Sequence, residues 1–482
     1  MFMSKPKVLF VASECVPIAK VGGLGDVIGS LPRVLKKLGL DVRIAIPKYG
    51  VVDDKKYPSR LVASGIKINK EKINIYQARL PESKAILYLL ENKRFFGEND
   101  IYFERTAFVG SFKEIERFLF FSKAVLEIFS AINWSPEIIH CHDWHTAILP
   151  VLAKLQVKSQ KSKVKSLLTI HNLANQGKWR AKDILDFLGL KGNEVESLKI
   201  KNGEENLNIL EQGILNADIL NTVSETYKKE ILTKEYGEGL EKPLLKRKKV
   251  LYGILNGLDI ERFDPKTDPD IKVNYSQKSF KKKIENKLEL QKIVGFSKGK
   301  NTPFLGFVNR LTSQKGVDLI IKIIPELVKM DFQLIILGVG LKSYEEKLLE
   351  LGKKYPQNIS AQIKFDSVLA QKIYAGSDIF LMPSKFEPCG LGQMIAMRYG
   401  AIPIVRKTGG LADTIKDKKT GFLFEKYESS ALLKIINLAA GYYKNKSAWR
   451  KLTKRAMIQD FSWQRPAKEY LKLYKKIIEL AN

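Results

Sequence analysis

Residues 7–27 read KVLFVASECVPIAKVGGLGDV, and they set the pattern that the rest of the chain repeats. The apolar run at 7–14 predicts a buried strand, and the apolar residues from Val27 onward recur with the period of a helix. Glycines in the loop between them let the backbone approach a ligand, and the next helix would offer free N–H groups to an anion. A plain tight turn is the alternative. The spacing fits neither the dinucleotide fingerprint nor the Walker phosphate loop.

Short β-rich runs alternate with helical segments along nearly the whole chain, which is typical of parallel sheets flanked by helices. The predicted strands are 8–14, 41–47, 85–91, 137–143, 166–172, 218–224 and 249–255, then 302–308, 332–339, 361–365, 378–384, 401–407 and 421–424. A polar connector at 256–287 separates the two series. We therefore predict an α/β protein with two Rossmann-like, doubly wound domains that face a cleft, divided near residue 260. Ligands of such sheets bind beyond the carboxyl ends of the strands.

The chain has 482 residues and a formal net charge of +30. Such a charge suits a nucleic-acid or membrane partner, but the lysines are spread along the chain, as in KSFKKKIENK (278–287), without an arginine-rich arm. We expect a solvated lysine surface and no nucleic-acid partner. We also expect no membrane partner, because charge or glycine breaks every apolar stretch short of the roughly 20 residues that a span needs.

Cysteine usage and the first residues indicate the compartment. Cys15, Cys141 and Cys389 share no CxxC spacing, which argues against disulfides and zinc sites. The first residues run straight into a strand pattern without a signal peptide, so we expect a cytoplasmic protein. The sequence leaves the oligomeric state open.

Two local features are at odds with their surroundings. Pro32 lies inside the predicted helix 26–39, where we expect a distortion. The one DxD motif, Asp268-Pro-Asp270, lies in the connector, and we interpret it as a solvated loop rather than a metal site.

All four histidines lie at or just beyond the ends of two predicted strands. A zinc cluster is disfavoured, since alternate residues of a strand point to opposite faces. We expect structural roles for His140 and His145. His171 and Asn172 follow a strand where a substrate would lie, and we predict a functional role for them. In the first loop, Lys20 supplies charge for an anion and Asp26 an acceptor for a hydroxyl.

The second half carries three loops of the same kind. Arg310 and Lys315 follow a strand and precede a helix, where two cations would hold a diphosphate and stabilise it as a leaving group; two solvated cations are the alternative. Glu387 follows another strand and would bind sugar hydroxyls or cap a helix. A glycine pair, Gly409 and Gly410, follows a third strand.

Taken together, seven motifs resemble those of bacterial glycogen synthases and plant starch synthases, in the same order along the chain. They are KVGGLGDV (20–27), HCHDWHTA (140–147), HNLANQG (171–177), NGLDIERFDP (256–265), NRLTSQKG (309–316), PSKFEPCGLGQ (383–393) and TGGLADT (408–414). The resemblance implies a GT-B glycosyltransferase that transfers glucose from ADP-glucose to an α-1,4-glucan with retention of configuration. It implies no cofactor or metal. It also implies that the last helix, 465–482, joins the acceptor-side domain 1–260, and that 261–464 is the donor side.

The resemblance assigns roles residue by residue. It places Lys20, Gly22 and Gly23 at the donor diphosphate, and Asp26 and Asp143 around the transferred glucose and the acceptor.

His171, with Asn172 beside it, would lie close to the reacting sugar. Arg310 and Lys315 would neutralise the leaving diphosphate, and Glu387 would bind glucose hydroxyls. The remaining positions assigned to substrate binding are Cys389, Gly390 and Leu391 at the sugar, Thr408, Gly409 and Gly410 at the phosphates, and Asn256 near the hinge.

The residue inventory supplies no pair of carboxylates suited to double displacement, so we favour a front-face departure of the leaving group. Two positions depart from the family pattern, with Gln371 where histidine is common and Gly392 where threonine is common. They leave a UDP-glucose-dependent enzyme open as an alternative. A non-catalytic glucan-binding relative is the alternative from another class.

Overall fold

The chain consists of two compact units. A computed structural model describes residues 6–479 except 82, 104–110, 159–163, 192–193, 195–197, 199–204 and 298. Residues 1–257 and 463–482 form one unit, here the N-unit, and residues 258–462 form the other, the C-unit. The sequence had suggested divisions at 260 and 464.

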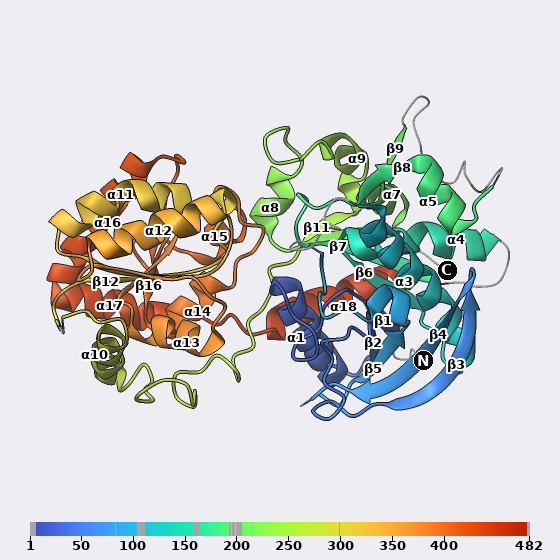
Figure 1. Ribbon diagram of the computed structural model, residues 1–482, viewed down its shortest axis with the longest axis horizontal. Coiled ribbons are helices and arrows are strands. Elements are labelled where there is room, and N and C mark those ends of the chain that lie inside the picture. The colour runs from blue at the N-terminus through green and yellow to red at the C-terminus, as the bar shows by residue number, and fades with distance from the viewer. Residues whose placement is uncertain are drawn as a thin grey trace. The chain divides into compact units, whose positions relative to one another are not determined.

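A nine-stranded sheet forms the centre of the N-unit (Figure 1). Its strands, in spatial order, are β11 (Leu251–Gly253), β10 (Ile219–Thr222), β7 (Lys165–Ile170), β6 (Ile138–His142), β1 (Lys7–Val11), β2 (Asp41–Pro47), β5 (Ile86–Glu91), β4 (Glu71–Arg79) and β3 (Arg60–Ile68). The seven strands from β11 to β5 are parallel. Numbered along the chain, six of them take the order 3-2-1-4-5-6 of a Rossmann fold, so the chain reverses direction across the sheet between β1 and β6.

Helices surround this sheet. They are α1 (Gly23–Lys37), α2 (Lys93–Phe96), α3 (Phe112–Ala131), α4 (Leu149–Lys158), α5 (Ala181–Leu188), α7 (Ile209–Asn216), α8 (Glu225–Glu230), α9 (Glu241–Lys246) and α18 (Gln464–Glu479), with a small β8 (Lys178–Arg180) and β9 (Asn206–Asn208) ladder. The last helix, α18, packs on α1 and β7 and so belongs to the N-unit.

Two details of the N-unit differ from the sequence prediction. The sequence analysis missed the antiparallel hairpin β3–β4. Its second strand begins the stretch INIYQAR (73–79) with alternating apolar and polar residues, and Asn69, which has a positive φ, lies in the turn between the two strands. The distortion expected at Pro32 is wrong at the level of secondary structure, because α1 runs unbroken from Gly23 to Lys37. A proline removes a single N–H donor, and the surrounding apolar face, which is buried, holds the helix together.

The C-unit repeats the architecture with a six-stranded parallel sheet. Its spatial order is β14 (Ile359–Gln362), β13 (Gln333–Leu337), β12 (Phe304–Val308), β15 (Ile379–Met382), β16 (Ile402–Arg406) and β17 (Phe422–Phe424). This is again 3-2-1-4-5-6, with the reversal between β12 and β15. The two Rossmann-like sheets confirm the predicted fold class. The strand predicted at 361–365 is displaced, since β14 begins and ends earlier.

Helices cover both faces of this sheet (Figure 1). One face carries α11 (Val317–Lys329), α12 (Lys342–Lys354) and α16 (Ser429–Lys444); the other carries α10 (Lys283–Ile293), α13 (Ser367–Gly376), α14 (Gly392–Arg398) and α17 (Lys446–Met457). The short helix α15 (Gly409–Thr414) follows β16. No described helix is both long enough and apolar enough to cross a membrane.

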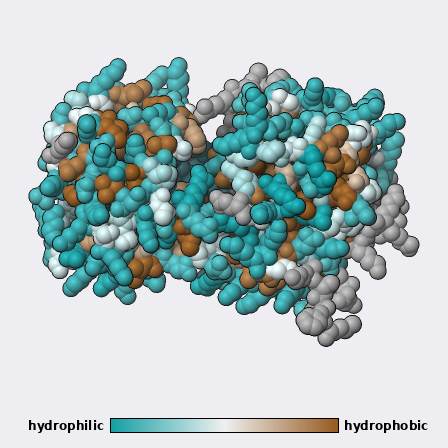
Figure 2. Space-filling view, turned by 90° about the horizontal axis from the view of Figure 1, so that it is seen from below, coloured by the Kyte–Doolittle hydropathy of each residue, from teal (hydrophilic) through white to brown (hydrophobic). Residues whose placement is uncertain are grey.

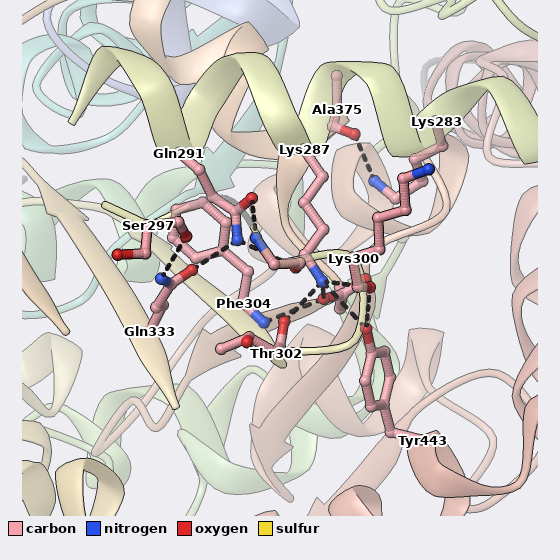
Figure 3. Close-up of polar contacts among 12 residues, drawn as sticks. Lys283, Lys287, Gln291, Ser297, Lys300, Thr302, Phe304, Gln333, Ala375 and Tyr443 are labelled. Carbon is pink, nitrogen blue, oxygen red and sulfur yellow. Dashed lines mark hydrogen bonds and ion pairs between the residues drawn. The ribbon is translucent and has the colours of Figure 1, made fainter. Parts of the chain in front are cut away.

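Hydrophilic side chains cover most of the face shown in Figure 2, as the high lysine content predicts. The lysine-rich stretch 278–287 is nevertheless not entirely solvated. Lys283 and Lys287 are buried, and Figure 3 shows their amines among backbone carbonyls. Lys287 Nζ pairs with Asp378 at 2.7 Å and donates to the carbonyl of Thr302, whereas Lys283 Nζ donates to the carbonyls of Tyr374 and Ala375 at the end of α13.

The DxD motif of the connector is also buried rather than solvated at its first residue. Asp268 is 3% exposed, and its Oδ2 accepts hydrogen bonds from Tyr399 Oη at 2.5 Å and Gln371 Nε2 at 3.0 Å. A buried carboxylate requires such partners. The connector is therefore anchored to the C-unit through this side chain.

Replacing Lys283 by methionine tests the cost of burying its amine. Burial lowers the pKa of Lys283 to about 7, so above this pH the unfolded chain holds a proton that the folded chain releases. The free energy of unfolding of the wild type should then rise relative to that of Lys283→Met as the pH increases from about 7 towards 10.5. Urea titrations at neutral and alkaline pH measure this difference.

The exposed neighbour Lys281 supplies the control, since Lys281→Met removes the same charge from solvent. The stability of Lys281→Met, measured over the same interval, is the reference for that of Lys283→Met. A stability difference between wild type and Lys283→Met that does not change with pH would show that burial does not perturb this amine.

Candidate active site

In the N-unit the glycine loop follows β1 and Asp143 follows β6, the two strands at the reversal point of the sheet, whereas His171 and Asn172 follow the neighbouring strand β7. The loop after β1 is organised by Glu14, which is 3% exposed. Its Oε2 accepts the N–H groups of Val21 and Gly22, each at 2.7 Å, and its Oε1 accepts the Tyr102 hydroxyl at 2.7 Å. A Cβ on Gly25 would lie 3.1 Å from Oε2, so glycine also makes room for this carboxylate. Sequence reasoning missed Glu14; a carboxylate at the end of the predicted strand 8–14 was the available signal.

Lys20 and Asp26 of the glycine loop form an ion pair, with Nζ 2.8 Å from Oδ1. Gly22 is the N-cap of α1, and Gly23 is the first residue of that helix. Because glycine brings no capping side chain, the cap leaves the first helical N–H groups open to another acceptor. The loop thus presents a partly exposed cation, a carboxylate and a helix N-terminus together.

Asp143 ties the end of β6 to the end of β7. It has a positive φ of 55°, which is strained for a residue other than glycine. Its Oδ1 accepts the N–H of His171 at 2.6 Å and that of Asn172 at 3.3 Å. Burial raises the pKa of Asp143 to about 7, against the opposing effect of these two hydrogen bonds. The Asn172 side chain accepts the N–H of Ala174.

The four histidines differ in their hydrogen-bond partners. Both ring nitrogens of His140 are paired, with Tyr474 Oη at 2.9 Å and Thr169 Oγ1 at 2.7 Å, as expected for a structural residue. His145 packs on aromatic rings, but its Nδ1 has no partner among the described residues, so it is not fully satisfied. Burial lowers the pKa of His171 to about 3, which keeps it neutral. Within the described ranges, no group of three or more His, Cys, Asp or Glu side chains is arranged to hold a metal ion.

Asn256, which lies just beyond β11, is 6% exposed. Its Oδ1 is buried and accepts no hydrogen bond from the part of the chain that the structure describes. The side chain therefore holds an unused acceptor.

In the C-unit a salt bridge joins the loops after β12 and β15, the two strands at the reversal point. Lys315 Nζ lies 2.9 and 2.7 Å from the two carboxylate oxygens of Glu387. Ser384 Oγ donates to Glu387 Oε2 at 3.0 Å. Both charged side chains are largely buried, at 11% and 7% exposed, so the pair is held rigidly.

Arg310, which precedes Lys315 in the loop after β12, is exposed. Its guanidinium makes no hydrogen bond or ion pair with any described residue, while its backbone N–H donates to Asn309 Oδ1 and its backbone carbonyl accepts the N–H of Thr312. Lys315 is thus paired with a carboxylate, whereas the guanidinium of Arg310, in the same loop, is uncompensated: it has no charged partner among the described residues.

Glycines allow the last two predicted loops to pack tightly. A Cβ on Gly409 would lie 2.0 Å from the Glu387 carbonyl oxygen, and one on Gly410 would lie 2.2 Å from that of Cys389. The Gly410 N–H donates to the Glu387 carbonyl at 3.1 Å. It is therefore used internally, and Gly410 contributes close packing rather than a free donor.

Neighbouring contacts fix the other predicted residues of these loops. Gln393 Nε2 donates to the carbonyls of Cys389 and Gly390, the latter at a positive φ of 74°. Leu391 is the N-cap of α14, and Thr408, which is buried, is the N-cap of α15.

Two side chains that sequence reasoning missed bind the loops that carry the salt bridge. Arg406, buried at the end of β16, donates through Nε to the Ser384 carbonyl at 2.9 Å and through a second nitrogen to the carbonyl of Lys385. The Tyr427 hydroxyl contacts the Ser313 carbonyl at 2.9 Å and Asp318 at 2.6 Å. These contacts hold the loops that carry Glu387 and Lys315. A charged residue at the end of a buried strand was the signal for Arg406.

The two departures from the family pattern have structural explanations. Gln371 is buried and its amide is bonded to Asp268 and Tyr399. A Cβ at Gly392 would lie 3.2 Å from both Met382 Sδ and the Phe380 ring, so a larger side chain would have to displace them. Neither position therefore offers a side chain to a nucleotide.

Comparison with known proteins identifies similar chains. A family profile described as "Starch synthase catalytic domain" matches residues 7–246, and "Glycosyl transferases group 1" matches 277–455. A protein named glycogen synthase from Thermotoga petrophila is 44% identical over 489 residues, with 98% of this chain and 99% of that protein covered. One of the same name from Clostridium beijerinckii is 42% identical over 484 residues, with 98% and 99% covered.

Solved structures give the same picture. The catalytic domain of starch synthase IV from Arabidopsis thaliana, bound to ADP and acarbose, superimposes with a TM-score of 0.90 at 32% identity, covering 99% of this chain and 100% of that one. Sucrose-phosphate synthase from Thermosynechococcus elongatus shares the fold, with a TM-score of 0.63 at 15% identity and the same coverage.

Asp143→Asn tests the perturbed carboxyl of the N-unit. The folded chain holds the Asp143 proton up to about pH 7, whereas the unfolded chain releases it near 3.8. The free energy of unfolding of the wild type should therefore fall relative to that of Asp143→Asn as the pH rises across this interval. Chemical denaturation of both proteins over this range measures the effect.

Asp143→Ala is the companion variant, since alanine leaves two N–H groups without their acceptor. It should lose about 1–3 kcal/mol relative to Asp143→Asn at every pH. If the curves of wild type and Asp143→Asn run parallel, the carboxyl of Asp143 titrates normally.

Proposed function

The chain belongs to the glycogen and starch synthase family of hexosyltransferases, and from this premise we propose that it transfers glucose from ADP-glucose to the non-reducing end of an α-1,4-glucan with retention of configuration. The observation that carries the proposal is the Lys315–Glu387 pair at the reversal point of a Rossmann sheet, with Arg310 exposed in the same loop as Lys315. Open α/β sheets bind nucleotides at that point.

Arg310 and Lys315 would bind the donor diphosphate. The bond that breaks joins C1 of the glucose to a diphosphate oxygen, so negative charge grows on the leaving group. Arg310 is free to form paired hydrogen bonds with phosphate oxygens, and Lys315 adds a point charge nearby. Charge groups that are already in place stabilise such a transition state without reorganisation.

Glu387 would accept hydrogen bonds from glucose hydroxyls. Lys315 and Ser384 hold the carboxylate in one orientation, and Arg406 holds the backbone around it. The neighbouring loop of Cys389, Gly390 and Leu391 would place backbone groups beside the same sugar.

The donor base would lie towards β13 and β14. In Rossmann sheets the nucleoside extends from the reversal point over the second strand of the series. Phe365, in the loop after β14, is 80% exposed and offers an aromatic face at that side of the C-unit sheet. We assign it to stacking on the adenine.

In the N-unit, the glycine loop with Lys20, Gly22 and Gly23 would approach the phosphates. Asp26, Asp143, His171, Asn172 and Asn256 would contact the transferred glucose and the glucan. The unpaired Oδ1 of Asn256 and the partly exposed Lys20–Asp26 pair are groups that a polyhydroxylated ligand would satisfy.

Retention would proceed by departure and attack on one face of the sugar. The bond from C1 to the diphosphate oxygen breaks, the oxygen of the acceptor hydroxyl bonds to C1 on the same face, and its proton passes to the diphosphate or to an acceptor-side group. A double displacement needs a free carboxylate nucleophile. Glu14 and Asp143 each accept two backbone N–H groups, and Asp26 is paired with Lys20. These bonds make all three carboxylates poor nucleophiles, which favours the front-face path.

Transfer assays with purified protein, glycogen and EDTA test the proposal, comparing ADP-glucose with UDP-glucose. We expect transfer from ADP-glucose, and Lys315→Met and Glu387→Gln should each lower kcat by about 10²–10³-fold because a preorganised charge is lost. Lys329→Met is the control, as this lysine is 70% exposed at the end of α11, and it should transfer at the parent rate.

Preference for UDP-glucose would retain the mechanism and overturn the donor assignment. Glucan binding without transfer from either donor would support a non-catalytic relative. Parent rates for both Lys315→Met and Glu387→Gln would contradict the assigned site.

A further inference from the structure

His142 is a buried side chain that the proposed function does not use, yet it contacts the predicted functional histidine directly. Its Nδ1 lies 3.0 Å from Nε2 of His171. The ring stacks on Phe10 at 5.5 Å between centroids. The backbone N–H of His142 donates to Thr146 Oγ1, and this hydroxyl donates to the carbonyl of His142. The position of this ring is therefore fixed independently of His171.

The hydrogen bond between the two rings has two possible directions. Both rings are neutral near pH 7, since burial lowers the pKa of each. Each therefore carries one N–H, and either His142 Nδ1 donates to His171 Nε2 or His171 Nε2 donates to His142 Nδ1.

The far side of His142 decides between them. Its Nε2 is buried and has no partner among the described residues. If His171 were the donor, the His142 proton would sit on this Nε2 as a buried N–H without an acceptor. If His142 is the donor, its Nε2 is unprotonated and is a buried acceptor without a donor. Unpaired buried acceptors are tolerated better than unpaired N–H groups, which favours His142 as the donor.

A second anchor fixes the backbone of His171. Asp143 accepts its N–H at 2.6 Å, so backbone and ring are held from different residues of one segment. The remaining ring nitrogen, Nδ1 of His171, has no partner in the described part of the chain and is not among the fully buried unpaired atoms. It is the atom that is left to meet a ligand.

We propose that His142 is a positioning residue, which donates its Nδ1–H to Nε2 of His171 and thereby fixes the His171 proton on Nδ1. His171 then presents Nδ1–H as a hydrogen-bond donor to an oxygen of the bound sugar. The second part rests on the proposed function; the tautomer itself does not.

Nitrogen NMR of the full-length protein labelled with ¹⁵N-histidine tests the tautomer without any activity. The chain has only four histidines, so single substitutions assign the ring signals. We expect a protonated Nδ1 and an unprotonated Nε2 for His171 near neutral pH. The opposite pattern would overturn the proposal, whatever the protein catalyses.

Variants of His142 test its role. His142→Phe keeps a ring beside Phe10 but removes the donor, so the Nδ1–H form of His171 should lose its dominance and kcat/KM should fall on the order of tenfold. His142→Asn places an amide donor near the former Nδ1 and should restore both. His145→Gln, which removes another buried histidine of the segment, should leave the His171 tautomer unchanged.

An unchanged tautomer and kcat/KM in His142→Phe would refute the positioning role. If His142→Phe does not fold, the tautomer of His171 in the wild-type protein, measured by nitrogen NMR, decides whether the proposal stands. A protein that shows the expected tautomer but no glucosyl transfer would refute the proposed function and leave the His142–His171 assignment standing.

Discussion

Each sheet places its first and fourth parallel strands side by side, and the rest of the site depends on this arrangement. After β1 and β6 in the N-unit, and after β12 and β15 in the C-unit, the chain leaves towards opposite faces of the sheet. Loops that are distant in sequence therefore end next to one another. Lys315 reaches Glu387 because β12 and β15 are neighbours at the reversal point, and Asp143 reaches the backbone of His171 because β6 is also paired with β7 on its other side.

Burial of charge then determines how rigid these loops are. A buried carboxylate is costly unless hydrogen bonds surround it, so Glu14 draws the glycine loop around itself and Glu387 is held by Lys315 and Ser384. The same requirement explains Asp268, which the connector buries against Tyr399. The polar groups that hold the loops are thus as important as those that would touch a ligand.

The sequence predicted the two Rossmann sheets well, because strand runs such as 41–47 are rich in apolar residues and are bounded by turn residues. It missed the β3–β4 hairpin, whose weaker alternation lies at the edge of the sheet. Motif order brought out Arg310, Lys315 and Glu387. It did not single out Glu14, His142 or Arg406, because their importance lies in what they hydrogen-bond to in three dimensions, and a charged residue at the end of a strand is only a weak signal of it. The lysine count likewise suggested a solvated surface, while Lys283 is buried by the packing of α10 on α13.

A crystal structure of the protein with ADP bound tests the central claim most directly. The account predicts the diphosphate over the carboxyl ends of β12 and β15, within hydrogen-bond distance of Arg310 and Lys315. Diphosphate bound at any other part of the C-unit sheet, with the Lys315–Glu387 pair and Arg310 untouched, would contradict it.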